Sequence, residues 1–195
     1  RGCYPKKVLV GLSEIMSRTQ KMMGKGISEM PEFSWNDIQN FKKKFVDAVP
    51  AATEKDLKSL GIDLYHQTPK FVDENTLSVE GKTIKAQKIV IATGQKPLEL
   101  KIPGRDLALV SDDFLDLKEV PQSMIFIGAG YIGMELAHIA GRLGVKVTIL
   151  DMADRPLSNF NEKIVKPLTK ISEDIGIDFI FNAGVSEIEK LQKNF

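Results

Sequence analysis

Two apolar runs flank a glycine cluster and a helical repeat in the second half of the chain. Met124–Ile127 has the pattern of a short strand, and Val145–Leu150 has that of another, which ends on Asp151. Three glycines follow the first run in the spacing G-x-G-x-x-G: Gly128, Gly130 and Gly133. Apolar positions at helical spacing come next. Strand, glycine turn, helix, strand and acid in this order predict a dinucleotide-binding unit.

Each glycine of this fingerprint has its own role. Gly128 permits the tight turn, Gly130 lets the backbone approach a pyrophosphate, and Gly133 lets helix and strand pack closely. The N-terminus of the helix offers unpaired N–H groups and a partial positive charge to phosphates. Asp151 can accept hydrogen bonds from both ribose hydroxyls and would repel a 2′-phosphate, which favours NAD over NADP. A glycine-rich turn without a ligand is the alternative interpretation.

Helical periodicity governs the first 61 residues. Pro5 suits the first turn of one helix, because its missing N–H costs nothing there. Ser34–Asp37 has the spacing of a capping box and starts a second helix, and a shorter helical piece follows Pro50. The apolar spacing predicts these buried positions: Val8, Leu12, Ile15, Thr19 and Met22 on the first helix, and Ile38, Phe41, Phe45 and Val49 on the second. The lysine run Lys42–Lys44 is assigned to a solvated face.

Alternation with period two then replaces the helical spacing. Four short strands are predicted: Ile62–His66, Lys70–Val72, Thr76–Val79 and Thr83–Lys85. Together they predict a small β-meander inserted into an α/β domain. Lys88–Gly94 has the pattern of a buried strand with a tight glycine exit, and Gln95–Lys118 that of an irregular crossing between two domains.

A further helix and strand follow Asp151. Glu162–Asp174 has helical spacing, and Pro167 is the place for a kink. Four apolar residues share one face of this helix: Ile164, Leu168, Ile171 and Ile175. Ile177–Phe181 is the next predicted strand. The order βαβαβ predicts a parallel sheet with right-handed crossovers.

Composition bounds the function classes. The chain has 195 residues, 43% of them hydrophobic, so it can bury a core. A net charge of +1 gives no sign of nucleic-acid or membrane binding. The single cysteine, Cys3, excludes a disulfide within the chain and favours a cytoplasmic location. Neither His66 nor His138 is predicted to be catalytic, and the open ends of the pattern suggest a fragment of a longer protein.

Three separated motifs resemble those of the pyridine nucleotide–disulfide oxidoreductases. Arg1–Lys7, R-G-C-Y-P-K-K, resembles the second half of the redox-disulfide motif of this family. Ile89–Gly94 resembles the family's ATG strand, and Gly128–Glu135 its NAD(P) fingerprint. The likeness covers nearly the whole chain and is greatest to the branch of glutathione reductase, dihydrolipoamide dehydrogenase and mercuric reductase.

The resemblance implies a fold and an activity. Residues 1–110 would be the C-terminal part of the first FAD-binding segment, Rossmann-like with an inserted β-meander, and residues 111–195 an NAD(P)-binding, parallel-sheet Rossmann-like domain. Electrons from NADH, or less favourably NADPH, would pass through FAD and a redox-active cysteine pair to a disulfide substrate. The partner cysteine, the acid–base histidine and the C-terminal domain that forms a homodimer would lie outside the chain. The chain alone would therefore lack catalysis.

The resemblance also implies residue roles at the flavin. Cys3 matches the flavin-facing cysteine, which acts as a thiolate, and a helix N-terminus favours that charge. Lys6 matches the lysine near the reactive flavin nitrogen, and Glu135 its ion-pair partner. Two backbone positions match flavin contacts: Thr93 and Gly94. Pro69 falls where the family contacts the flavin adenine, but a proline has no N–H to donate there.

Further roles are implied at the nicotinamide nucleotide. The fingerprint positions Ala129 and Ile132 would contact it, and Tyr131 would cover the nicotinamide pocket. Val185 would make a backbone contact to the nucleotide adenine. NADP-using relatives carry arginine where this chain has Met152 and Ser158. Arg155 alone could reach towards a 2′-phosphate.

Two other classes of protein remain open. One is a flavoenzyme of the NADH oxidase or peroxidase type, which uses one reactive cysteine. The sequence of Leu150–Leu157 would also be consistent with such an enzyme. The other is a non-catalytic nucleotide-binding fragment or NADH sensor.

Overall fold

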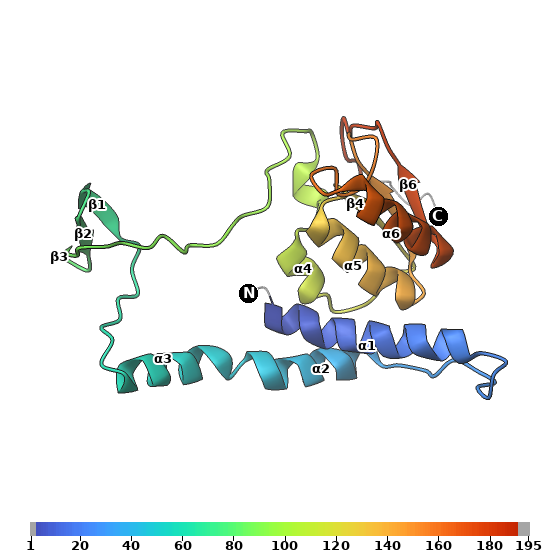
Figure 1. The fold of residues 1–195 in the computed structure, drawn as a ribbon, viewed down its shortest axis with the longest axis horizontal. Helices are drawn as coiled ribbons and strands as arrows, with labels where there is room; N and C mark the ends of the chain where they lie inside the picture. The colour runs from blue at the N-terminus through green and yellow to red at the C-terminus, as the bar shows by residue number, and fades with distance from the viewer. Residues whose placement is uncertain (1–2, 191–195) are drawn as a thin grey trace. The chain divides into compact units, whose positions relative to one another are not determined.

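The computed structural model describes residues 3–190 and contains two compact units (Figure 1). The first unit comprises the chain up to Val46 together with the chain from Pro97 onward, and the second comprises Asp47–Lys96. No helix among the described residues has both the length and the apolar content needed to cross a bilayer.

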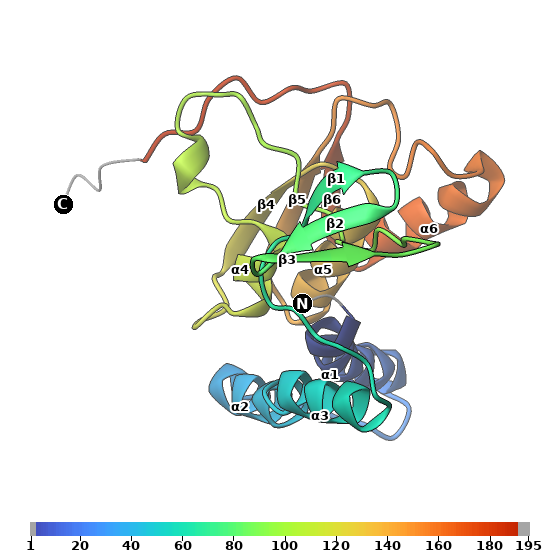
Figure 2. The ribbon, with the colours of Figure 1, turned by 90° about the vertical axis from the view of Figure 1, so that its left-hand side faces the viewer.

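A three-stranded parallel sheet forms the centre of the first unit. Its strands are β4 (Ser123–Ile127), β5 (Lys146–Leu150) and β6 (Ile177–Ile180), in the order β4-β5-β6 (Figure 2). Helix α5 (Tyr131–Arg142) joins the first two strands and contacts all three, and α6 (Glu162–Asp174) precedes and contacts β6. The βαβαβ prediction and its parallel sheet are confirmed.

The core of this unit lies between the sheet and α5. Val147, Ile149 and Ile177 point from the strands into it, and Ile139 meets them from the helix, all with at most 1% of their surface exposed. Burying apolar side chains of this size stabilises the fold by about 1.5–3 kcal/mol each. The βαβ unit is therefore fixed by a continuous apolar core.

Helix α1 (Cys3–Met22) contacts both α5 and a second helix, α2 (Trp35–Val46). Pro5 lies in the first turn of α1 as predicted, but the buried face agrees with the prediction only in part, through Leu12. Leu9, Ser13 and Met16 are buried, whereas Ile15 and Met22 are about half exposed. The helix has apolar residues on more than one side, so contacts with two neighbours, rather than spacing, decide which side is buried.

Helix α2 begins as predicted, since the Ser34 hydroxyl accepts a hydrogen bond from the N–H of Asp37. Its predicted faces are correct only in part, because Ile38 packs against the core and Lys43 and Lys44 are exposed, but other positions differ. Phe41 and Phe45 are about half exposed, while Lys42 is 3% exposed. The Lys42 ammonium donates to the carbonyl oxygen of Leu115 and pairs with Asp116.

The segment predicted as an irregular crossing contains two short helices. The 3₁₀-helix η1 is Arg105–Leu107 and α4 is Ser111–Leu115. The last carbonyls of α4 have no partners inside the helix. Lys42 and Gln39 of α2 donate to the carbonyl of Leu115, and the Trp35 indole donates to that of Leu117. This interaction explains why one lysine of the run is buried.

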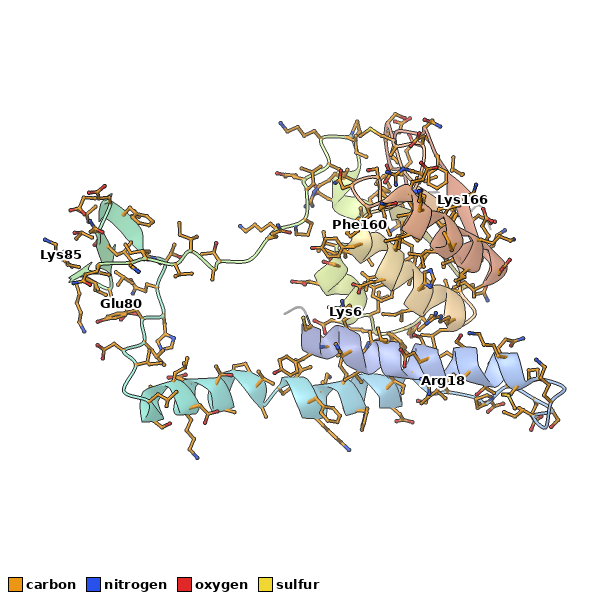
Figure 3. The ribbon with its side chains drawn as sticks, viewed as in Figure 1. Lys6, Arg18, Glu80, Lys85, Phe160 and Lys166 are labelled. Atoms are coloured by element: carbon orange, nitrogen blue, oxygen red, sulfur yellow. The ribbon has the colours of Figure 1, made fainter. Side chains whose placement is uncertain are left out.

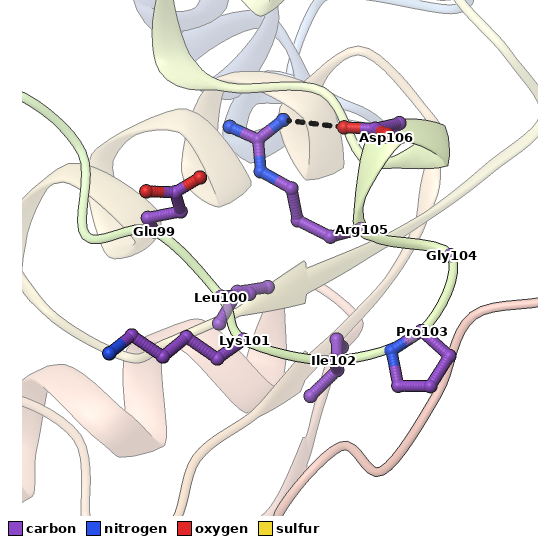
Figure 4. A pocket seen from close by; sticks show the side chains of 8 residues that line it. All are labelled: Glu99, Leu100, Lys101, Ile102, Pro103, Gly104, Arg105 and Asp106. Atoms are coloured by element: carbon purple, nitrogen blue, oxygen red, sulfur yellow. Dashed lines mark hydrogen bonds and ion pairs between the residues drawn. The ribbon is translucent and has the colours of Figure 1, made fainter.

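The loop before α4 also contacts the end of the described chain. Figure 4 shows residues 99–106 around a shallow hollow, with Arg105 paired to Asp106. The N–H of Ile188 donates to the carbonyl of Pro103. Gly104 has φ +73°, and a Cβ there would overlap the backbone of Ile188. Position 104 therefore requires glycine for two reasons, the positive φ and the close approach of the Ile188 backbone.

Helix α6 has the predicted bounds, and Pro167 lies inside it. Asn161 caps it by accepting from the N–H of Lys163. The buried residues are Val165 and Ser172, with Leu168 partly buried. Two positions of the predicted apolar face are exposed: Ile164 and Ile171.

The second unit contains α3 (Val49–Ser59) and an antiparallel sheet in the order β1-β2-β3. The strands are β1 (Lys70–Asp73), β2 (Thr76–Val79) and β3 (Lys82–Lys85), which confirms the β-meander. Glu80 and Gly81 both have positive φ, as the two-residue hairpin turn between β2 and β3 requires.

Two predicted strands of this unit do not form. Ile62–His66 belongs to no strand, and Glu80 accepts a hydrogen bond from the N–H of His66. Lys88–Gly94 is also outside any strand, and Val90 is 87% exposed. A strand needs a neighbour to pair its backbone groups, and none of the strands described here pairs with these segments.

Candidate dinucleotide site

The fingerprint lies where the carboxyl ends of β4 and β5 meet. Gly128 leaves β4 with φ +103°, and its N–H donates to the carbonyl of Leu150 at 2.8 Å. A Cβ on Gly133 would overlap the carbonyl oxygen of Gly128. The tight turn at Gly128 and the close approach at Gly133 are therefore both present. In open α/β sheets this edge is where ligands bind.

Ala129 is held on both of its backbone groups. Its N–H donates to Asp151 Oδ2 at 2.5 Å, and its carbonyl accepts from the N–H of Leu157 at 2.9 Å. Only 1% of its surface is exposed. The N–H groups that can face a pyrophosphate are thus the next ones, at the start of α5. Gly130 is the N-cap, and Tyr131 and Ile132, both exposed, lie in the first turn.

Asp151 follows β5 and is partly buried. Its second oxygen, Oδ1, accepts from the N–H of Ala153 at 2.7 Å. A carboxylate has about four lone-pair positions, so two backbone bonds leave capacity for ribose hydroxyls. The backbone carbonyl of Asp151 accepts from Ala183, which stands two residues before Val185. The structure thus brings Asp151 and the Val185 loop to the same edge of the sheet as the fingerprint.

A second group of predicted residues lies at the start of α1, where Figure 3 labels Lys6. The Lys6 ammonium is 2.6 Å from Glu135 Oε2 on α5. Both side chains are partly exposed, so the pair contributes at most about 1 kcal/mol to stability. Cys3 stands three residues before Lys6, exposed and with a free thiol. The Lys6–Glu135 pair links the cysteine-bearing helix to the fingerprint helix.

The remaining predicted site residues and the two histidines belong to other parts of the chain. Pro69, Thr93 and Gly94 belong to the second unit and are exposed. His66 also lies there, near Glu54. His138 packs inside the first unit, where its Nε2 is 2.8 Å from Ser172 Oγ, and burial together with the charge of Arg142 lowers its pKa. His138 thus has a packing role between α5 and α6.

The sequence connected the loop after Asp151 with a 2′-phosphate, through Met152, Arg155 and Ser158, but it gave no sign of the contact between this loop and the fingerprint. Residues 151–160 connect to the fingerprint through Leu157, whose φ is +50°. A leucine gives no sequence signal for this conformation.

The profile of the family described as "Pyridine nucleotide-disulphide oxidoreductase" matches residues 1–194. The chain belongs to this family. The predicted fold class is confirmed with it, as is the membership of an enzyme family.

Individual relatives agree with this membership. The chain is 34% identical to dihydrolipoyl dehydrogenase 3 of Haloarcula marismortui over 93% of this chain and 40% of that one. It is 32% identical to mercuric reductase of Bacillus cereus over 97% of this chain and 31% of that one. The copper(II) complex of HOCl-induced flavoprotein disulfide reductase RclA from Escherichia coli has a similar structure. That likeness has a TM-score of 0.74 at 27% identity and covers 97% of this chain and 41% of that one. The chain thus spans about 40% of the length of the dihydrolipoyl dehydrogenase it matches.

Proposed function

We propose that this chain is the part of an FAD-dependent oxidoreductase in which electrons from NADH pass through FAD and a redox-active cysteine pair to a disulfide substrate. The observation that carries the proposal is one connected arrangement. Asp151 accepts a hydrogen bond from the fingerprint residue Ala129, and the ion pair between Glu135 and Lys6 connects the fingerprint helix to the helix that begins with Cys3.

The nucleotide end fits a dinucleotide. The start of α5 supplies N–H groups for the pyrophosphate, and the space required at Gly133 is kept free of a side chain. Asp151 supplies acceptors for the adenosine ribose, and Val185 lies in a neighbouring loop. A 2′-phosphate would face the Asp151 carboxylate, which supports NADH as the electron donor.

The cysteine end fits a thiol reaction. When bound, FAD supplies the means to take a hydride from NADH and deliver two electrons to a disulfide. In balance, NADH, one proton and a disulfide give NAD⁺ and two thiols. Cys3 supplies one sulfur of the pair, and Lys6 holds a positive charge one turn along the same helix. Glu135 holds that ammonium in place, and exposed Tyr131 stands at the start of the same helix, α5.

The rest of the proposal concerns the full-length protein. Thr93, Gly94 and Pro69 are proposed to contact the flavin. The boundary between the FAD-binding part of the chain and its NAD(P)-binding domain is proposed to lie near residue 110. A homodimer formed through a further domain is proposed as well. A disulfide in a small molecule or a protein is the proposed substrate.

The test is anaerobic titration of the full-length protein with NADH, with free thiols counted afterwards. Two new thiols per NADH, lost on replacing Cys3→Ser, would support the disulfide enzyme. Flavin that bleaches without new thiols would instead indicate the oxidase or peroxidase class. A folded protein without flavin colour would indicate a nucleotide-binding module.

The preference for NADH is tested at Asp151. We expect Asp151→Asn to bind NADPH better relative to NADH, because the repulsion of the 2′-phosphate is removed while an acceptor oxygen remains. The two dissociation constants, measured by calorimetry, give this ratio. An unchanged ratio would contradict the role of Asp151 in choosing the nucleotide.

A further inference from the structure

Arg155 lies in the loop that connects β5 to α6, close to the candidate dinucleotide site. Its guanidinium donates to three backbone carbonyls of the same loop. Nη1 reaches Leu157 O at 3.2 Å, and Nη2 reaches Ser158 O at 2.5 Å and Phe160 O at 3.2 Å. The planar guanidinium suits this task because its donors point in fixed, divergent directions.

The loop conformation that Arg155 holds is not one the chain adopts freely. Leu157 has φ +50°, a conformation that residues with a side chain rarely adopt. Pro156 is buried beside it, and the N–H of Phe160 closes a turn onto the carbonyl of Leu157. Three charge-assisted hydrogen bonds from one side chain offset the strain at Leu157.

This loop conformation fixes the fingerprint. The N–H of Leu157 donates to the carbonyl of Ala129, on the residue between the first two glycines of the motif. On the other side, Asp151 accepts from the N–H of Ala129. Residues of one loop therefore hydrogen-bond to both the N–H and the carbonyl of Ala129. The direction in which the backbone enters α5, and hence the aim of the N–H groups of Gly130 and Tyr131, depends on that loop.

We propose that Arg155 is a positioning residue for the nucleotide. It holds Leu157 against Ala129, so that the fingerprint keeps the form that receives a pyrophosphate, and it is not a ligand for a 2′-phosphate. To reach such a phosphate the guanidinium would have to release three carbonyls. This inference rests on the proposed nucleotide site. It concerns the part that NADH and NADPH share, so both nucleotides depend on Arg155 equally.

The experiment compares the chain with its Arg155→Ala, Arg155→Lys and Arg105→Ala variants. Arg105 is the matched control, because its guanidinium pairs only with the neighbouring Asp106 among the described residues. Dissociation constants for NADH and NADPH are measured by calorimetry, and circular dichroism confirms that each variant is folded. Hydrogen exchange of the Leu157 and Ala129 amides reports the loop, and exchange in β5 reports the core.

The expected result has three parts. Arg155→Ala raises the dissociation constants for NADH and NADPH by the same factor, about tenfold or more. This factor corresponds to the loss of a network of charge-assisted hydrogen bonds. Its Leu157 and Ala129 amides exchange faster while β5 is unchanged. Lysine at this position, which keeps the charge but not the fork, restores part of the affinity, and Arg105→Ala binds as the unchanged chain does.

Three other outcomes would overturn the inference. A loss of affinity confined to NADPH would make Arg155 a phosphate ligand. Unchanged affinity for both nucleotides would show that the loop does not position the fingerprint. Faster exchange in β5 as well would show a general loss of stability. Failure of the proposed site is distinguishable from all of these, because the unchanged, folded chain would then bind neither nucleotide.

Discussion

Lys42 lies in a buried contact between α2 and α4, and replacing it with methionine measures what that contact contributes. The ammonium is 2.9 Å from Asp116 Oδ1 and also donates to the carbonyl of Leu115. Methionine keeps most of the length and apolar stem of the side chain but removes the charge and its donors. The perturbation is therefore limited to the polar end.

The expected loss of unfolding free energy depends on whether Asp116 and the Leu115 carbonyl keep other hydrogen-bond partners. A hydrogen bond to a charged group contributes about 1.5–3 kcal/mol net, and breaking a fully buried ion pair costs about 3–5 kcal/mol. Here Asp116 is 55% exposed, so water replaces the ammonium at that carboxylate. The carbonyl of Leu115 keeps a bond from Gln39 at 3.3 Å. Neither partner is left buried without a hydrogen bond, so we expect Lys42→Met to lower the free energy of unfolding by about 1–2 kcal/mol.

The assay is urea unfolding of the chain, followed by circular dichroism and by tryptophan fluorescence. Trp35 is the single tryptophan, and its indole donates to the carbonyl of Leu117 at 2.8 Å, so its emission reports the same contact. Lys43→Met is the matched control, because Lys43 neighbours Lys42 on α2 and is exposed. It should change stability by less than about 0.5 kcal/mol. Equal effects of the two substitutions, or none from Lys42→Met, would refute the buried role of Lys42.

Three further predictions concern Gly133 in the fingerprint, Gly104 in the loop before α4, and the partly buried His138. Gly133→Ala should weaken NADH binding about tenfold or more, because the new Cβ displaces the Gly128 carbonyl. Gly141→Ala on the same helix should not, because a Cβ there meets side chains and no backbone, with Ile177 at 3.4 Å and Ile175 at 4.0 Å; calorimetry compares the two variants. Gly104→Ala should lower the unfolding midpoint in urea more than Gly24→Ala, since both glycines have φ +73° but only Gly104 lies against another backbone; equal effects would show that conformation alone matters. The lowered pKa of His138 means that the unfolded chain takes up the proton first, so stability should fall as pH drops below about 6.5. His138→Gln should flatten that fall between pH 7.5 and 5.5 in urea titrations. An unchanged slope would contradict the assignment.

The nucleotide-binding unit could be predicted from the sequence because its signals are local. The turn at Gly128, the approach at Gly133 and the acid at Asp151 follow from short-range spacing, and the structure joins them through Ala129. The bounds of α6 were also predictable, since an N-cap asparagine and an apolar repeat lie within the segment itself. Local chemistry fixes where these elements begin and how they connect.

The buried faces could not be predicted, because they depend on distant partners. Lys42 lies in a run of three lysines, and charged side chains are mostly exposed. It is buried because α4 ends beside α2 and presents carbonyls that need donors. Likewise Leu9 and Ser13 are buried, rather than Ile15, because α1 contacts both α2 and α5. Each outcome depends on residues far away in sequence.

The segment 88–94 shows the same limit at the level of a strand. Its β-branched, apolar pattern is strong, yet Val90 and Ile91 are 87% and 72% exposed and belong to no strand. An apolar, β-branched run indicates only that a segment favours a buried strand, whereas a ladder needs a neighbouring strand to receive its backbone hydrogen bonds. Among residues 3–190 the two sheets are β1-β2-β3 and β4-β5-β6, and neither includes this segment. The roles proposed for Thr93 and Gly94 therefore have no support from these two sheets, while those proposed for Asp151 and Arg155 rest on contacts among the described residues.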